Sequence, residues 1–144
     1  MTASAWVSAE PIDLPALLAR VDAPTHGAVT SFVGQVRDHD PEASGRVVAL
    51  RYTCHPDAPA LIEQIVARTV AEHDPAGEAD VAATHRVGDL DVGDLALVVA
   101  VGSAHRDLTF TLCRAVVEAI KHELPVWKQQ FEADGSHAWS GLGC

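Results

Sequence analysis

Five segments of the chain have apolar patterns that predict strands. Residues 27–37 and 126–132 alternate between apolar and polar positions, and 27–37 are also rich in β-branched side chains. Residues 47–54, 79–88 and 94–102 are likewise expected to be strands. We therefore expect five strands.

Apolar residues at helical spacing mark three further segments, 13–21, 56–74 and 106–123. Asp13 can cap the first helix, and Pro125 favours an end to the third at the preceding residue. The apolar stripe of the second helix comprises Leu61, Ile65, Val66 and Thr69, with Ile62 on its flank. The stripe of the third comprises Leu108, Leu112, Ala115, Val116 and Ala119.

Polar, turn-forming segments separate these elements. Residues 38–46 predict a loop, 89–94 a turn-rich connection, and Asp134-Gly135 a hairpin turn. The order is helix, two strands, helix, two strands, helix, strand. It predicts an α+β fold with helices packed on a mostly antiparallel sheet, in a single domain spanning 1–144.

Composition and charge narrow the functional classes. The 144 residues are 48% hydrophobic, which supports a packed core, and they carry a formal charge of −10. Nucleic acids and anionic membranes attract basic faces, so this charge argues against both as general partners. Residues 1–15 lack signal-peptide features, and the longest apolar run, 95–101, is too short to span a bilayer. The expected compartment is the cytoplasm.

The spacing of cysteine and histidine does not predict a metal site. Cys54, Cys113 and Cys144 form no C-x-x-C pair, and Cys113 is expected to be a buried core residue. The eight histidines include no H-x-x-x-H or H-E-x-x-H spacing. We expect neither a metal ion nor a cofactor.

Lysine usage is the least ordinary feature of the composition. Lys121 and Lys128 are the only lysines, and they lie on either side of Pro125. Each has an ordinary explanation: a helical pair with Glu118 for the first, and an outward strand position for the second. A shared site would explain both, because two ammonium groups can hold a phosphorylated or carboxylated ligand, or act as acid, base or nucleophile. We expect both side chains to be exposed.

The start of the third helix adds further basic residues. Ser103 is a candidate N-cap, and His105 and Arg106 fall near the first turn, where the helix dipole disfavours cations. A bound anion would reverse that effect, although Arg106 could instead pair with Asp107. Earlier in the chain, Arg37 ends a strand in which a glycine at position 34 suggests a bulge.

Five motifs in this order resemble one family. They are "FVGQVRDHD", "LRYTCHPDA", "THRVGDLDVGD", "VGSAHR" and "IKHELPVWKQQF", and the resemblance covers Gly27 to Trp139. They are similar to the large, catalytic subunit of molybdopterin synthase, the MoaE family.

This resemblance implies a fold of the α/β-hammerhead type and a sulfurtransferase activity. The family converts cyclic pyranopterin monophosphate into molybdopterin by installing the dithiolene. Sulfur comes from a thiocarboxylate on the C-terminal Gly-Gly tail of a small ubiquitin-like subunit. The resemblance also implies a homodimer of large subunits within a heterotetramer, with active sites that draw residues from both large subunits.

Matching the motifs position by position assigns six site residues. Lys121 and Lys128 take the catalytic positions, and Arg37, His105, Arg106 and Phe32 take the substrate-binding positions. The chain departs from the family at "WSGLGC", where relatives commonly continue into a longer charged tail. No Lys or Arg follows Lys128, so that contribution is absent or replaced, with His137 as a candidate.

Two other functional classes stay open on the sequence. A non-catalytic module could bind the Gly-Gly tail of a ubiquitin-like protein, and it would not need Lys121. Alternatively, an enzyme could use one lysine to form a Schiff base with a carbonyl substrate.

Overall fold

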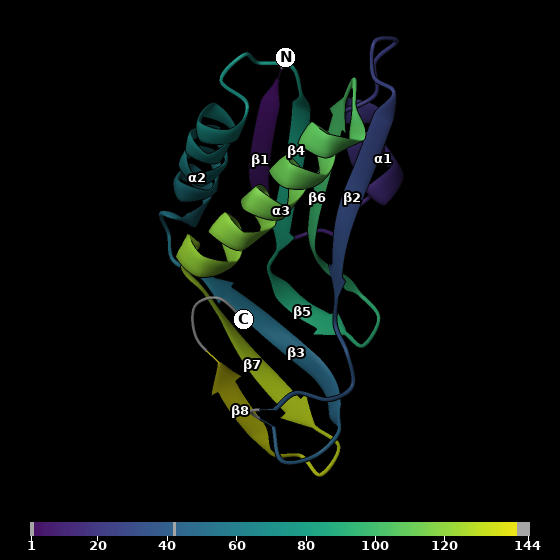
Figure 1. Cartoon of the computed structure of the whole chain (residues 1–144). Coiled ribbons are helices and arrows are strands. Elements are labelled where there is room, and N and C mark those ends of the chain that lie inside the picture. The colour runs from purple at the N-terminus through teal and green to yellow at the C-terminus, as the bar shows by residue number, and fades with distance from the viewer. Residues whose placement is uncertain (1, 42, 141–144) are drawn as a thin grey trace.

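The strands form two four-stranded sheets in the computed structural model, which describes residues 2–41 and 43–140 (Figure 1). The first sheet has the order β1-β4-β6-β2 and comprises β1 (Ala3–Ser8), β4 (Asp80–Arg86), β6 (Leu95–Ser103) and β2 (Ala28–Gln35). The second sheet has the order β5-β3-β7-β8 and comprises β5 (Gly88–Asp91), β3 (Val47–Cys54), β7 (Val126–Glu132) and β8 (His137–Ser140). Only β1 and β4 pair in parallel among these described strands.

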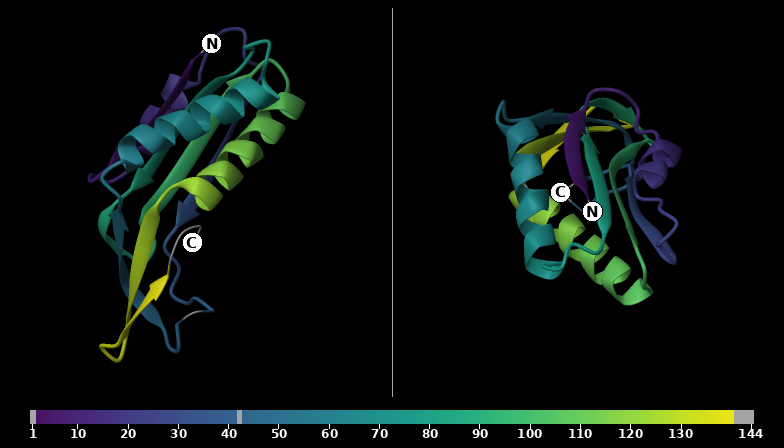
Figure 2. Two further views of the ribbon diagram at one scale, coloured as in Figure 1. Left: turned by 90° about the vertical axis from the view of Figure 1, so that its left-hand side faces the viewer. Right: turned by 90° about the horizontal axis from the view of Figure 1, so that it is seen from above.

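Three helices cover the first sheet, on both of its faces (Figure 2). α2 (Ala58–His73) and α3 (Arg106–Glu123) pack on one face, and α1 (Leu14–Arg20) packs on the other. β6 is therefore buried on both sides, which explains why its sequence is a continuous apolar run. Successive residues point to opposite faces, so Val99 faces α3 while Val98 faces α1.

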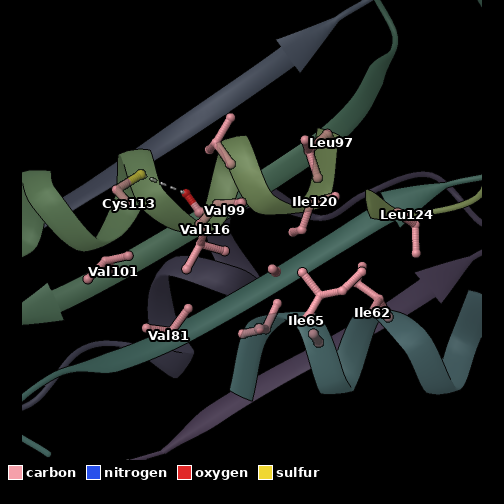
Figure 3. Packing of buried hydrophobic residues seen from close by; sticks show 14 of the residues in the cluster. Ile62, Ile65, Val81, Leu97, Val99, Val101, Cys113, Val116, Ile120 and Leu124 are labelled. Atoms are coloured by element: carbon pink, nitrogen blue, oxygen red, sulfur yellow. Dashed lines mark hydrogen bonds between the residues drawn. The ribbon is translucent and has the colours of Figure 1, made fainter. Parts of the chain in front are cut away.

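The larger core lies between α2, α3 and the first sheet (Figure 3). Its labelled members include Ile62 and Ile65 from α2, Val116 and Ile120 from α3, and Val81 from β4. These side chains are almost completely buried, and each contributes about 1.5–3 kcal/mol to the free energy of folding by the apolar area it removes from water.

The chain passes between the sheets at points close to the end of α3. β4 and β5 are separated by one residue but belong to different sheets, and Gly88 makes this change of direction with a φ of 98°. α3 ends at Glu123, and β7 then begins in the second sheet. The last turn of α3 therefore lies where the two sheets meet (Figure 1).

The α+β class is confirmed, and all three predicted helices and all five predicted strands are present. Asp13 caps α1 by accepting a hydrogen bond from the Ala16 amide at 3.1 Å, as predicted. The bulge is also confirmed, because the pairing of β2 with β6 shifts register between Gly34 and Gln35. β1, β5 and β8 were not predicted as strands, and residues 89–94 are not purely a turn because β5 occupies the first half of them.

The apolar stripes were predicted in part. In α2, Ile65, Val66 and Thr69 are buried as expected, while Leu61 is only partly buried and Ile62 faces the core directly. In α3, Leu112 and Val116 are buried as expected. The rest of its buried face is Thr109, Cys113, Val117 and Ile120, rather than Leu108, Ala115 and Ala119. Cys113 is thus a core residue, as predicted.

Candidate active site

A pocket of about 310 Å³ lies at the junction of the two sheets. The end of β2, the inner face of the second sheet, β4 and the last turn of α3 all contribute to its wall. Its polar lining includes Arg37, Asp40, Tyr52, His85, Lys121, Lys128 and Gln130. Three of the six predicted site residues, Arg37 and both lysines, therefore come together in one chain.

Lys121 reaches this pocket from the last turn of α3 and is partly buried. A cation is favourable there, because the C-terminal end of a helix carries partial negative charge. The pairing of Lys121 with Glu118, considered from the sequence, stays a prediction. Glu118 lies 3.7 Å from the ring of His122, on the exposed side of the helix.

Lys128 reaches the pocket from β7, and its side chain is 11% exposed. Strand alternation places Lys128, Gln130 and Glu132 on the inner face of the second sheet. The ammonium lies 3.0 Å from the Asp40 carboxylate, which is equally buried. The expectation that Lys128 is exposed was wrong, because its partner lies on a loop 88 residues away in the sequence.

The β2–β3 loop that carries Asp40 is attached to β7 at a second point. The Glu132 carboxylate accepts hydrogen bonds from the amide of Gly45 and, at 3.1 Å, from the hydroxyl of Ser44. Glu132 is itself buried. Two acidic contacts with β7 thus hold this loop beside the pocket.

Arg37 directly follows the bulge at the end of β2, and its side chain is exposed at the rim of the pocket. The absence of a side chain at Gly34 leaves room for the Phe32 ring, since a Cβ atom there would be 3.1 Å from the ring. Phe32 itself lines a neighbouring groove with Phe110 and Val117, not the lysine pocket.

His105 and Arg106 lie at the opposite end of α3. Fifteen residues separate Arg106 from Lys121, which at 1.5 Å per residue is roughly 22 Å along the helix. Both side chains are exposed, and among the described residues no ion pair joins Arg106 to Asp107. A single chain therefore does not bring these two residues to the lysine pocket.

The prediction of Ser103 as the N-cap of α3 was wrong. His105 occupies the N-cap position without a side-chain capping bond. The Ser103 hydroxyl is buried, donates to the His105 carbonyl oxygen at 2.9 Å, and lies 2.6 Å from the Thr109 hydroxyl. Hydrogen bonds from Ser103 and Thr109 to the His105 carbonyl oxygen thus fix the start of the helix.

Five polar residues of the pocket were not predicted: Gln35, Asp40, Tyr52, His85 and Gln130. Gln130 is 2% exposed, and its Nε2 atom has no hydrogen-bond partner among the described residues. Burial lowers the pKa of His85 to about 4, and the charge of Lys121 adds to this lowering. The strand alternation of β7 could have identified Gln130, but no local pattern identifies the other four.

The charges of the pocket favour an anionic ligand. Arg37, Lys121 and Lys128 face one carboxylate, Asp40, so the lining is cationic within a chain whose formal charge is −10. A cleft with low-dielectric walls focuses such a local field. Within the described residues, no cluster of His, Cys, Asp and Glu has the arrangement of a metal site, and no helix is suited to crossing a membrane.

Comparison with known proteins agrees with the resemblance seen in the motifs. The family model described as MoaE protein matches residues 7–123. The molybdopterin synthase catalytic subunit 1 of Mycobacterium tuberculosis is 35% identical over 132 residues, which covers 92% of this chain and 86% of that protein. The chain therefore belongs to the MoaE family.

Solved structures share the whole arrangement of elements. Molybdopterin synthase from Staphylococcus aureus superposes with a TM-score of 0.81 at 26% identity, over 94% of this chain and 96% of that one. The MoaE protein of Burkholderia ambifaria gives a TM-score of 0.75 at 31% identity, over 100% of this chain and 92% of that one.

Proposed function

We propose that this chain is the catalytic subunit of molybdopterin synthase. It transfers sulfur from the C-terminal thiocarboxylate of a small ubiquitin-like subunit to cyclic pyranopterin monophosphate, forming the dithiolene of molybdopterin. The observation that carries this proposal is the meeting of Lys121, Lys128 and Arg37 around one pocket in a member of this family.

The two lysines act on the thiocarboxylate and on the charge that develops during transfer. Lys121, at the accessible end of α3, lies beside the thiocarboxylate, and Lys128 stabilises negative charge as sulfur attacks the pyranopterin. Arg37 at the rim contacts the substrate phosphate, for which a guanidinium is well suited. Phe32 borders the neighbouring apolar groove, where a planar ring can pack.

His105 and Arg106 complete the phosphate site from a second copy of the chain. They are exposed and roughly 22 Å from Lys121 along α3, so they serve the pocket of a partner subunit rather than their own. We accordingly propose a homodimer of this chain, with one small subunit for each copy and with residues 1–144 working as one domain. The cytoplasm is the proposed compartment.

One reconstitution tests the proposal. The purified chain is mixed with the thiocarboxylated small subunit and cyclic pyranopterin monophosphate, and the dithiolene product is assayed. Wild type should turn over, and Lys121→Ala should not. Arg51→Ala serves as a matched control, because Arg51 is an exposed cation on the outer face of the second sheet, paired with Asp89.

The same assay separates the alternative functions. A module that only binds the tail would retain the small subunit but form no product in either protein. Retention of normal turnover in both Lys121→Ala and Lys128→Ala would contradict the assignment of the catalytic residues. A Schiff-base enzyme would instead be trapped by borohydride with a carbonyl substrate.

A further inference from the structure

His85 is a buried histidine in the pocket for which the motif matching gives no role. It lies near the end of β4, is 6% exposed, and lines the pocket together with Lys121. Its ring packs edge-on against Tyr52, with centroids 4.9 Å apart and planes at 82°. Two strands of different sheets thus fix the orientation of this imidazole.

The hydrogen bonding of His85 defines its tautomer. Nδ1 lies 2.8 Å from the backbone carbonyl oxygen of Arg86, which can only accept. Nδ1 therefore carries the proton, and in the neutral ring Nε2 carries a lone pair. Nε2 lies across the ring from Nδ1, so its lone pair points away from the Arg86 carbonyl, in a residue that lines the pocket.

The surroundings keep this imidazole neutral. Burial is the main reason that the pKa of His85 falls to about 4, and the charge of Lys121 contributes. The titratable groups that share the pocket are Tyr52 from β3, Lys121 from α3, Lys128 from β7, Arg37 after β2, and Asp40 from the β2–β3 loop. Asp40 is engaged with Lys128, so cations dominate around the ring.

We propose that His85 is a positioning residue, which holds the Lys121 ammonium in the pocket by accepting a hydrogen bond at Nε2. A neutral acceptor orients the ammonium without cancelling its charge, whereas a carboxylate in the same place would compete with an anionic ligand. The role of this contact in catalysis rests on the proposed function, but the contact itself does not.

The lysine content of the chain makes this contact directly measurable. Because Lys121 and Lys128 are the only lysines, isotope-labelled lysine gives two side-chain NMR signals, which Lys121→Arg and Lys128→Arg assign. The signals are followed from pH 6 to 11 in wild type, His85→Phe and His85→Gln. His122→Phe is the matched control, since this histidine neighbours Lys121 on the solvent side of α3.

Loss of the acceptor should make the ammonium easier to deprotonate. The midpoint of the Lys121 signal should fall by about one pH unit in His85→Phe, and by less in His85→Gln, whose amide can still accept. The Lys128 signal, and both signals in His122→Phe, should not move. If His85→Phe does not fold, the proposal is tested by His85→Gln alone, in which the midpoint of the Lys121 signal should still fall, by less than about one pH unit.

Two results would overturn the proposal. One is a Lys121 midpoint that is unchanged in the foldable His85 variants. The other is a ¹⁵N histidine spectrum of wild type that shows His85 protonated on Nε2 at pH 7. In the reconstituted enzyme, the alkaline limb of the pH–turnover profile should move with the Lys121 signal. An NMR shift without any turnover in wild type would support the contact and count against the proposed function.

Discussion

Lys121 lies in the last turn of a helix, is partly buried, and lines the pocket together with the neutral imidazole of His85. Lys128, by contrast, lies on a strand and is buried against the Asp40 carboxylate. The two ammonium groups line one pocket, but their surroundings differ. The ammonium of Lys128 is held in an ion pair with Asp40, which already balances its charge.

This difference implies a division of tasks between the lysines. An ammonium in a buried ion pair is kept in place, which suits a fixed electrostatic role. An ammonium beside a neutral imidazole, at the accessible end of a helix, suits contact with an incoming anion. We therefore expect changes at Lys121 to affect chemistry alone, and changes at Lys128 to affect chemistry and folding together.

The largest expected effect is the loss of turnover in Lys121→Ala. Removal of one preorganised donor from an active site costs about 10²–10³-fold in rate. The free energy of unfolding should change by no more than about 0.5 kcal/mol, since the side chain is partly exposed at the last turn of α3. The product assay measures turnover, and urea unfolding measures stability. A large loss of stability in Lys121→Ala would contradict the expected difference between the two lysines.

Low pH should destabilise the fold through the protonation of His85, which lines the pocket with Lys121. The pKa of this histidine is 6.5 as a reference and about 4 when folded, so the unfolded chain binds the proton first. Its contribution to stability is present above about pH 6.5 and is lost as the pH falls towards 4, by about 3 kcal/mol in total. In urea unfolding between pH 7 and 4, the free energy of unfolding should fall by up to about this amount more in wild type than in His85→Gln. Parallel pH dependence in the two proteins would contradict the prediction.

Lys128→Ala should destabilise the fold as well as abolish turnover. It removes the Lys128 ammonium from the largely buried Asp40 carboxylate, at a cost of about 2–3 kcal/mol in the free energy of unfolding, below the value for a fully buried pair. Adding Asp40→Asn to Lys128→Ala should recover part of the lost stability, because the amide carries no negative charge. Urea unfolding of the two single variants and the double variant forms the cycle that measures it, and strict additivity would mean that the pair is not coupled.

Asp40→Asn alone should have the smallest effect on stability, about 1 kcal/mol, because the amide can still contact the ammonium. The pocket becomes more cationic, so inorganic phosphate should inhibit turnover more strongly, while kcat falls as Lys128 is held less firmly. Inhibition constants and kcat are the measurements. An unchanged phosphate inhibition constant would show that this carboxylate does not compete with anions.

The sequence predicted the local elements well, and the long-range partners poorly. Alternation gave the bounds of β7, and the glycine at position 34 gave the bulge, because both depend on neighbouring residues. Two of the missed strands, β1 and β5, are short, and their strand conformation depends on pairing with another strand. β1 pairs with β4, which is distant in the sequence, and β5 pairs with β3 after the chain has changed sheets. The same limit hid the partner of Lys128, which folding brings from the β2–β3 loop.

The candidate site shows this limit again. The motifs assigned Arg37, both lysines, His105 and Arg106 to one site. A single chain brings Arg37 and the lysines to one pocket, while α3 holds His105 and Arg106 at its far end. A helix separates residues along its axis by a distance that sequence order alone does not convey. His85 was inside a quoted motif, yet its tautomer and burial depend on Tyr52 and Arg86, so its role became visible only in the fold.

The burial of Lys128 has a practical consequence for covalent labelling. Amine-directed reagents usually decorate many lysines, but this chain offers only two side-chain amines, and one of them is 11% exposed and ion-paired. Succinimidyl esters and amine-coupled sensor surfaces should therefore modify the pocket itself, at Lys121, before any other lysine. Biophysical work on this protein is better anchored through introduced cysteines on the outer face of the second sheet.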